Sequence, residues 1–274
     1  MENYNILTNK VSTIALEASE IIIKAHQSLS RQTTIKNNNP RNLVTETDLE
    51  VEEFLIKKLK ELLPQSHILS EETSSTIEDS ILKNESVWII DPIDGTNNFA
   101  HGNLHFCISI ALSVAGEVVL ALIHAPLLNE TYTATLGNGA FLNKKQITVS
   151  SATQLEEAIL VTGFPYEREK YMEQLIANLR SVLMRARGLR RYGSAALDLC
   201  WVAAGRLDGY FETTLNYWDV AAGSLILREA GGIVTSYNPE LLKQRPPLNL
   251  YCQELLAGNE KIAEELARIL VSNK

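Results

Sequence analysis

The chain is poor in cysteine, with three among 274 residues. Cys107, Cys200 and Cys252 stand apart in apolar surroundings, and none has the spacing of a CxxC or Cys/His metal site. An odd and scattered set argues against a disulfide framework and against a thiolate metal centre. Each cysteine is therefore expected to be a small buried hydrophobe in a reducing compartment.

Long apolar runs and an excess of basic charge are also missing. No stretch approaches the roughly 18 apolar residues of a membrane helix, and the N-terminus has no apolar leader segment. The 25 lysines and arginines are outnumbered by 33 aspartates and glutamates, for a formal net charge of −8. This balance argues against a basic nucleic-acid-binding face. The missing apolar segments predict a cytoplasmic protein with no membrane partner. An anionic substrate stays open, because bound cations can reverse the local sign of a carboxylate cluster.

Side-chain nucleophiles with a neighbouring base are a further absence. No Ser/His/Asp or Cys/His arrangement is apparent, and the five histidines are scattered. His101 and His105 flank a polar loop and are expected to pack or to belong to that loop. The sequence therefore does not predict covalent catalysis by the chain.

The most informative stretch is residues 88–96, with the sequence WIIDPIDGT. Its apolar start is typical of a buried strand. Asp91 and Asp94 follow on a turn that contains Pro92 and Gly95. Two carboxylates this close repel each other unless a cation lies between them, and Mg²⁺ and Ca²⁺ prefer such oxygen ligands. On this motif alone, an ordinary surface turn is the alternative.

Periodicity predicts the elements before this stretch. Apolar residues at helical spacing predict a helix up to about Arg31, and a polar loop follows at residues 33–41. A second helix is predicted to begin near Thr47, whose spacing to Glu50 fits a capping box, and to stop at Pro64.

Strands dominate the rest of the N-terminal half, which also contains two predicted polar loops at residues 73–86 and 97–103. They are predicted at residues 67–70, 106–114, 117–124, 130–135 and 140–143. From residue 158 strands alternate with helices: strands at 158–162, 208–212, 233–236 and 254–257, and helices at 171–187, 193–204, 218–230 and up to Ile269.

This pattern predicts an α+β/α/β layered fold with sheets covered on their faces. An antiparallel sheet is expected in the N-terminal half, residues 1–150, which carries most of the candidate metal ligands. A second, mixed sheet is expected in the C-terminal half, residues 151–274, which carries Asp219 and the substrate contacts. No repeat or low-complexity linker separates the halves, so they are expected to form one compact unit.

Acidic residues at the ends of elements form the candidate metal site. Glu71, Asp91 and Asp94 each follow an apolar strand, and Asp219 opens a helix. Together with the backbone carbonyl of Ile93, they could surround two or three hard cations.

Two further pairs have simple interpretations on the residues alone. Gly95 and Thr96 begin a helix or turn, where free amides favour a phosphate. Lys36 is most simply a solvated loop lysine, and Asp48 a favourable partner of a helix dipole.

At this point the chain resembles the inositol monophosphatase family of Mg²⁺-dependent phosphomonoesterases. The resemblance lies in WIIDPIDGTNNFAHG followed by HFCISIAL, and in YWDVAAGSLILREAGG. These match the family signatures D-P-[IL]-D-G-T and W-D-x-A-[AG]-G, and the Glu71-Glu72 pair stands where the family has it. The resemblance runs over nearly the whole chain. It implies the α-β-α-β-α sandwich of the sugar-phosphatase fold, a homodimer and inhibition by Li⁺.

The resemblance also implies a role for each metal ligand. Glu71, Asp91 and the carbonyl of Ile93 would hold one Mg²⁺. Asp91, Asp94 and Asp219 would hold a second, with Asp91 bridging, and a third, weaker ion would lie near Glu71.

The remaining roles are implied in the same way. Thr96 and Glu71 would position the attacking water, and Asp48 would hydrogen-bond Thr96. The amides of Gly95 and Thr96 would contact the phosphate of a small phosphorylated polyol. The positions that match substrate contacts are Gly95, Thr96, Gly193, Ser194, Ala195, Glu212, Asp219 and Lys36.

The chain departs from the family at two positions. Ser70 stands where the family usually has Gly, and Asn97 stands where it often has Thr. Neither change removes a ligand, but Ser70 bears on how the loop that carries Glu71 approaches the site.

Two classes of function follow from this resemblance. The first is Mg²⁺-dependent hydrolysis of inositol monophosphate, with fructose 1,6-bisphosphate, adenosine 3',5'-bisphosphate and histidinol phosphate as alternative substrates. The second is a regulatory protein on the same fold that associates with RNA polymerase. The basic stretch at residues 185–191 is the feature that would serve such a transcription partner.

Overall fold

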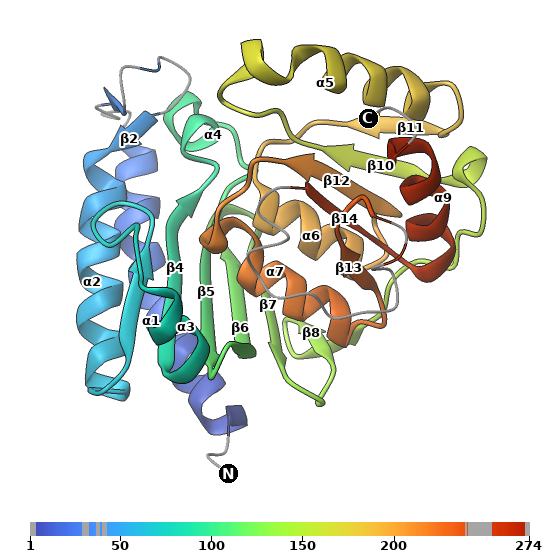
Figure 1. Ribbon diagram of the computed structural model, residues 1–274. Helices are drawn as coiled ribbons and strands as arrows, with labels where there is room; N and C mark the ends of the chain where they lie inside the picture. Colours follow the sequence, from blue (N-terminus) through green and yellow to red (C-terminus); the bar gives the residue numbers. More distant parts are fainter. Residues whose placement is uncertain are drawn as a thin grey trace.

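The computed structural model describes residues 4–28, 33–36, 39, 43–238, 240 and 254–271. Two sheets alternate with three layers of helices in the order α-β-α-β-α, as the sequence predicts (Figure 1). α1 and α2 cover one face of the first sheet, α6 and α7 lie between the sheets, and α5 and α9 cover the second sheet. The helices are α1 (Tyr4–Gln27), α2 (Glu46–Leu62), α3 (Asp79–Asn84), α4 (Thr96–His101), α5 (Arg168–Leu183), α6 (Ala195–Ala203), α7 (Tyr217–Glu229), α9 (Glu260–Val271) and the 3₁₀ turns Pro126–Leu128 and Leu155–Glu157.

The first sheet has seven strands in the order β3-β4-β5-β6-β7-β8-β9. Only β3 and β4 are parallel, and the other neighbours are antiparallel, which confirms the predicted antiparallel sheet. Its strands are β3 (His67–Ser70), β4 (Ser86–Asp94), β5 (Cys107–Val114), β6 (Glu117–Ala125), β7 (Glu130–Thr135), β8 (Ala140–Leu142) and β9 (Lys145–Ile147).

Strand β4 is apolar without interruption because both of its faces are covered. Trp88 and Ile90 pack into the core beneath α1 and α2. Val87 and Ile89 point the other way, into the core shared with α6 and α7. This is the burial expected of a strand between two helical layers. The strand is thereby fixed on both sides, and its end is a rigid place for functional side chains.

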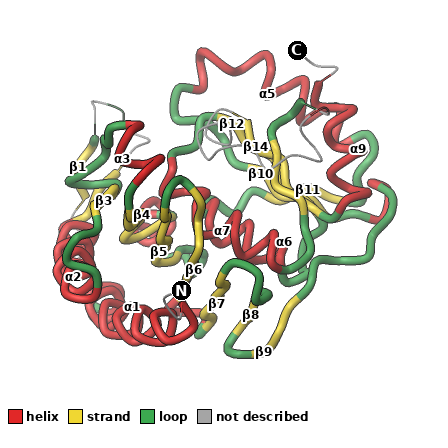
Figure 2. The backbone as a smooth tube through the Cα atoms, turned by 60° about the horizontal axis from the view of Figure 1, so that its bottom comes forward, coloured by secondary structure: helices red, strands yellow, loops and turns green. Residues whose placement is uncertain are grey.

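The second sheet has five strands in the order β11-β10-β12-β14-β13. β10 is parallel to β11 and β12, whereas β14 is antiparallel to β12 and β13, so the sheet is mixed, as predicted. Its strands are β10 (Ile159–Thr162), β11 (Gly188–Arg190), β12 (Gly209–Thr213), β13 (Ile233–Thr235) and β14 (Glu254–Gly258). Figure 2 shows α6 and α7 between the two sheets.

The predicted cap of the second helix was wrong by two residues. Thr45 is the N-cap of α2, and it forms a capping box with Asp48 rather than the predicted box of Thr47 and Glu50. Both pairs have the same spacing in the sequence. Of the two acidic residues, Asp48 is the buried one, and its carboxylate also contacts a residue outside the helix, Thr96.

Three predicted loops contain regular structure. In the first, β1 (Thr33–Ile35) pairs with β2 (Leu43–Thr45). The second contains α3, and the third is mostly α4, whose polar sequence hides one fully buried residue, Phe99.

Some predictions lie outside the described residues. These are most of the loop after Lys36 and the burial of Cys252. The first helix ends at Gln27, short of the predicted end near Arg31. Cys107 and Cys200 are buried and free, as predicted. None of the helices that the structure describes has the length and apolar character of a membrane-spanning segment.

Candidate active site

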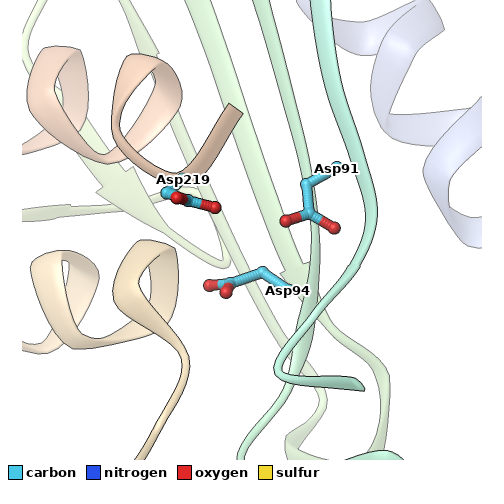
Figure 3. Close-up of side chains that lie close together, drawn as sticks. All are labelled: Asp91, Asp94 and Asp219. Atoms are coloured by element: carbon cyan, nitrogen blue, oxygen red, sulfur yellow. The ribbon is translucent and has the colours of Figure 1, made fainter. Parts of the chain in front are cut away.

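Three carboxylates from two elements converge in one cavity. Asp91 and Asp94 lie at the end of β4, and Asp219 lies in the first turn of α7. Figure 3 shows the three side chains pointing toward one another. Each offers a carboxylate oxygen within 4.8 Å of the others. The sequence predicted this meeting, although Asp219 is more than 120 positions away along the chain.

A bulge in β4 lets its two aspartates face the same way. Asp91 pairs with Ser109 of β5 and Asp94 pairs with Cys107, so three steps on β4 match two steps on β5. In a regular strand, side chains three positions apart point to opposite faces. The extra residue of a bulge changes this alternation, and such bulges often re-aim side chains next to active sites. Pro92, which has no N–H for the ladder, lies within the bulge.

Asp94 is held by the start of α6. Ser194 Oγ and the backbone N–H of Ala196 donate to the same carboxylate oxygen, at 2.6 and 2.7 Å. Burial raises the pKa of Asp94 to about 6, although these two hydrogen bonds oppose the shift. The N-terminal half therefore supplies this carboxylate, and the C-terminal half orients it.

The other two aspartates are held by nearby backbone. The N–H of Ile93 donates to Asp91 at 3.0 Å, and the N–H of Asn216 donates to Asp219 at 2.6 Å. Burial, and then the neighbouring carboxylates, raise the pKa of Asp91 well above its usual value, and the pKa of Asp219 rises for the same reasons. A cation among the three would relieve this repulsion. Their hard oxygen donors fit ions of the Mg²⁺ type.

Glu71 lines the same cavity but lies outside this compact group of three. Its carboxylate instead pairs with Lys36, whose Nζ lies 2.9 Å from Glu71 and 2.5 Å from Glu72. Burial and the charge of Glu71 raise the pKa of Glu72 to about 7. The ammonium of Lys36 therefore supplies the positive charge beside this acidic pair.

The predicted contact between Asp48 and Thr96 is present. Thr96 Oγ1 lies 3.0 Å from the carboxylate of Asp48 and 3.1 Å from the carbonyl oxygen of Ile93. Burial raises the pKa of Asp48 to about 6. Gly95 precedes Thr96 with φ +97°, and a Cβ at that position would lie 3.0 Å from the carbonyl oxygen of His105. Only glycine adopts this turn without strain.

The cavity brings together nearly all of the predicted site residues. Lys36 and Asp48 do not line it, and they contact site residues from behind. Its lining includes Glu71, Asp91, Ile93, Asp94, Gly95, Thr96, Gly193, Ser194, Ala195, Glu212 and Asp219.

Glu212 lines the cavity from β12 of the second sheet. The hydroxyl of Tyr210 donates to the carboxylate of Glu212, and burial raises the pKa of Glu212 to about 7. Gly163 faces this carboxylate, because a Cβ on Gly163 would lie within about 2 Å of it. The absence of a side chain at residue 163 thus leaves the space that Glu212 fills.

Sequence reasoning missed several residues of the cavity. Arg191 lies with its guanidinium 5.4 Å from the ring centroid of Phe164, and both line the cavity with Tyr166. Arg191 ends the basic stretch at residues 185–191, which was predicted to serve a partner rather than the cavity, and no motif signals Phe164 or Tyr166. Asn216 also lines it and caps α7, and its spacing to Asp219 is that of a capping box that could have been found.

His105 lies behind the cavity as a packed residue. Its ring packs against Tyr192 and Trp201 at centroid distances of 4.8 and 4.7 Å, and those two rings also contact each other at 5.1 Å. Its Nε2 lies 2.8 Å from a carboxylate oxygen of Asp198. Burial lowers the pKa of His105 to about 4, so the ring is neutral near pH 7. His101 is exposed, with its Nδ1 2.8 Å from the carbonyl oxygen of Asn97.

Comparison with known proteins gives one consistent result. The model of the inositol monophosphatase family matches residues 4–274. An inositol monophosphatase of Dictyostelium discoideum is 39% identical over 262 residues, which cover 94% of this chain and 92% of that protein. The Nus factor SuhB of Vibrio cholerae is 42% identical over 224 residues, 81% of this chain and 82% of its own. The crystal structure of extragenic suppressor protein suhB from Bartonella henselae matches with a TM-score of 0.87 and 35% identity, covering 97% and 98% of the two chains.

Proposed function

This chain belongs to the inositol monophosphatase family, and on that premise we propose that it hydrolyses inositol monophosphate to inositol and phosphate with the help of Mg²⁺. Family membership supports phosphatase activity and metal dependence. Inositol monophosphate as the substrate and Mg²⁺ as the ion are what we propose. The observation that carries it is the group Asp91, Asp94 and Asp219, whose carboxylates converge in the cavity.

The metal ligands in this proposal are those that the family resemblance implies. Asp91, Asp94 and Asp219 would hold one Mg²⁺, and Asp91 with Glu71 and the carbonyl of Ile93 would hold another. A third, weaker ion would lie near Glu71. Bound there, the ions would neutralise the phosphate dianion, activate the attacking water and stabilise the leaving alkoxide.

The chain's own groups position the reactants. Thr96 and Glu71 orient the attacking water, and Asp48 orients the hydroxyl of Thr96, 3.0 Å away. The backbone amides of Gly95 and Thr96 bind the phosphate. Positioning of this kind lowers the barrier without any covalent intermediate.

The polyol lies against the Glu212 side of the cavity in this proposal. Glu212 accepts hydrogen bonds from its hydroxyls, and the backbone at residues 193–195 completes the contact surface. Both line the same cavity as the carboxylates. The ion pair with Glu71 holds Lys36 near the part of the cavity where the phosphate would bind.

Phosphate release from a substrate panel tests the proposal. The panel holds inositol 1-phosphate, fructose 1,6-bisphosphate, adenosine 3',5'-bisphosphate and histidinol phosphate, each with and without Mg²⁺, and with Li⁺ added to Mg²⁺. We expect Mg²⁺-dependent release, greatest from inositol 1-phosphate and reduced by Li⁺. Asp94→Asn should abolish release, and Asp79→Asn, on the exposed α3, should not. Faster release from another substrate would keep the site and change the substrate.

The relatives named Nus factor SuhB favour a second candidate, a regulatory protein that binds the transcription machinery. Exposed arginines beyond α5, namely Arg185, Arg187 and Arg190, would serve such a partner. Pull-down against RNA polymerase components tests this candidate. Enrichment that Arg185→Glu and Arg187→Glu remove would support it, and no enrichment would count against it.

The assembly and the compartment are part of the same proposal. The homodimer follows from the family resemblance, and the cytoplasmic location from the lack of long apolar runs and of a disulfide framework in the sequence. Light scattering of the purified protein should give twice the 30.5 kDa mass of one chain. A monomeric mass would contradict this part of the proposal.

A further inference from the structure

Helix α2 buries a second carboxylate, Glu52, to which the proposed reaction gives no role. Glu52 lies one turn after Asp48 on the same face of the helix, and its side chain is fully buried. A buried carboxylate is costly unless hydrogen bonds compensate for the lost water. Glu52 has such compensation, and it comes from the loop that follows β3.

Three donors of that loop converge on Glu52. One carboxylate oxygen accepts from the backbone N–H of Glu72 at 2.9 Å. The other accepts from the backbone N–H of Thr73 at 2.8 Å and also from the hydroxyl of Thr73. Both oxygens therefore accept from N–H groups. A carboxyl side chain accepts at both oxygens, whereas a carboxamide would turn an NH₂ group toward one of the N–H donors.

The loop is also tied at its other side. The N–H of Glu71 lies 3.3 Å from the carbonyl oxygen of Ile90 on β4, and the N–H of Ser70 donates to the carbonyl of Ser74 at 3.0 Å. Glu71 is thus placed between an attachment to β4 and the attachment of its neighbours to Glu52. Loss of the second attachment would leave the backbone at residues 71–73 free to shift.

We propose that Glu52 is a positioning residue that holds the loop at residues 71–73 and so sets how tightly Glu71 binds Mg²⁺. This inference rests on the proposed function, in which Glu71 is a metal ligand. Helix α2 then serves both acidic strand ends: Asp48 orients Thr96 after β4, and Glu52 orients the loop after β3. Groups that hold metal ligands in this way typically contribute about 10–100-fold to metal affinity or activity.

Calorimetric titration with Mg²⁺ alone, in the absence of substrate, tests the role directly. Glu52→Gln should weaken the binding that involves Glu71 by roughly 10–100-fold. Glu53→Gln is the matched control, because Glu53 is exposed on the same helix, and it should bind Mg²⁺ as the wild type does. Raising Mg²⁺ in the assay should bring the kcat of Glu52→Gln close to that of the wild type, because the chemical groups are intact.

Thr73→Val supplies a milder variant in case Glu52→Gln does not fold. It removes one of the three donors and leaves the two backbone contacts, so we expect weakening of about two- to fivefold. Hydrogen exchange of the metal-free protein gives a second readout. The amides of Glu72 and Thr73 should exchange faster in Glu52→Gln than in the wild type, and their exchange rates in Glu53→Gln should match the wild type.

Each outcome distinguishes the two levels of the proposal. A folded Glu52→Gln that binds Mg²⁺ with wild-type affinity overturns the positioning role and leaves the proposed function intact. Lost activity that excess Mg²⁺ does not restore also overturns it. A wild-type protein that binds no Mg²⁺ overturns both.

Discussion

At the scale of the residue, the site is a concentration of buried acid. Asp94 and Asp48 have a pKa raised to about 6 by burial, and Glu212 has a pKa raised to about 7. The carboxylates of Asp91 and Asp219 lie within 4.8 Å of that of Asp94, so they add to the repulsion between negative charges. Such an arrangement is unfavourable by itself, and it is the expected condition of a site built to receive cations.

The stability of the metal-free protein should therefore fall as the pH rises. Because their pKa values are raised, these groups keep protons in the folded state that they release in the unfolded state. Their contribution to the stability of the fold is largest below about pH 4 and is lost as the pH rises through 6–7. Each unit of pKa shift corresponds to about 1.4 kcal/mol. In EDTA, the Tm should drop by several degrees between pH 5 and pH 8, and Mg²⁺ should reverse the drop.

Glu212→Gln provides the control for this prediction. It removes one titrating acid while keeping the shape of the side chain, so the fall in Tm between pH 6 and pH 8 should become shallower. A Tm in EDTA that stays level or rises over this range would contradict the buried-acid account.

Thr96 tests the positioning of water. Thr96→Val removes the hydroxyl that lies between Asp48 and the carbonyl of Ile93, and we expect kcat to fall by roughly 100-fold. Thr96→Ser keeps the hydroxyl and should stay within about fivefold of the wild type. Mg²⁺ binding, measured by calorimetry, should be the same in both variants. Equal kcat values for the Ser and Val variants would show that the hydroxyl has no part in the reaction.

At the scale of the element, strand ends and helix starts supply the site. β4 delivers two aspartates across its bulge, α7 delivers Asp219, and α2 supports the loops from behind. The parallel pair β10 and β12 delivers the Glu212 side of the cavity, because the register that aligns Thr162 with Phe211 places Gly163 beside Glu212.

Gly163→Ala should act through Glu212. The added Cβ would displace the carboxylate, so we expect the KM for inositol 1-phosphate to rise roughly tenfold, a loss of about 1.4 kcal/mol in binding. The Mg²⁺ dependence should not change, since the acidic group lies on other elements. Glu212→Gln should raise KM in the same direction, and the double variant should add little. Independent, additive effects of the two changes would contradict the contact.

The sequence predicts elements best where one physical cause dominates. β4 is covered on both faces, so its apolar run is unambiguous. The cap of α2 was misplaced because Thr45 with Asp48 and Thr47 with Glu50 have the same spacing, and burial of Asp48 decides between them. α4 was taken for a loop because its one buried apolar side chain, Phe99, lies among polar residues.

The same limit applies to the site. The acidic positions could be predicted because each stands at the end of an apolar segment. Glu52 offered a weak signal, four positions after Asp48. Arg191 stood out only as part of a basic stretch, and Tyr166 offered no signal, because only tertiary packing brings their loops to the cavity.

At the scale of the whole molecule, the two halves share both a core and a site. One hydrophobic cluster contains Val87 of the first sheet and Val161 of the second. Asp94 of the first half accepts hydrogen bonds from Ser194 and Ala196 of the second. The site can therefore form only where the two halves meet.

Thermal unfolding should accordingly be a single transition. Calorimetry should show one peak, and Mg²⁺ should move the whole peak upward, because ions that bind only the folded state stabilise it in proportion to their occupancy. Asp94→Asn should reduce this shift, and Asp79→Asn should keep it. Two peaks, of which Mg²⁺ moves one, would mean that the halves unfold separately.

The central claim is that carboxylates from both halves form one catalytic metal site. Phosphate release from inositol 1-phosphate at rising Mg²⁺, measured for the wild type and Asp219→Asn, tests it most directly. The account predicts saturable Mg²⁺ dependence for the wild type and a loss of at least about 100-fold for the variant, although its fold is intact. An Asp219→Asn protein that matches the wild type at every Mg²⁺ concentration would contradict the claim.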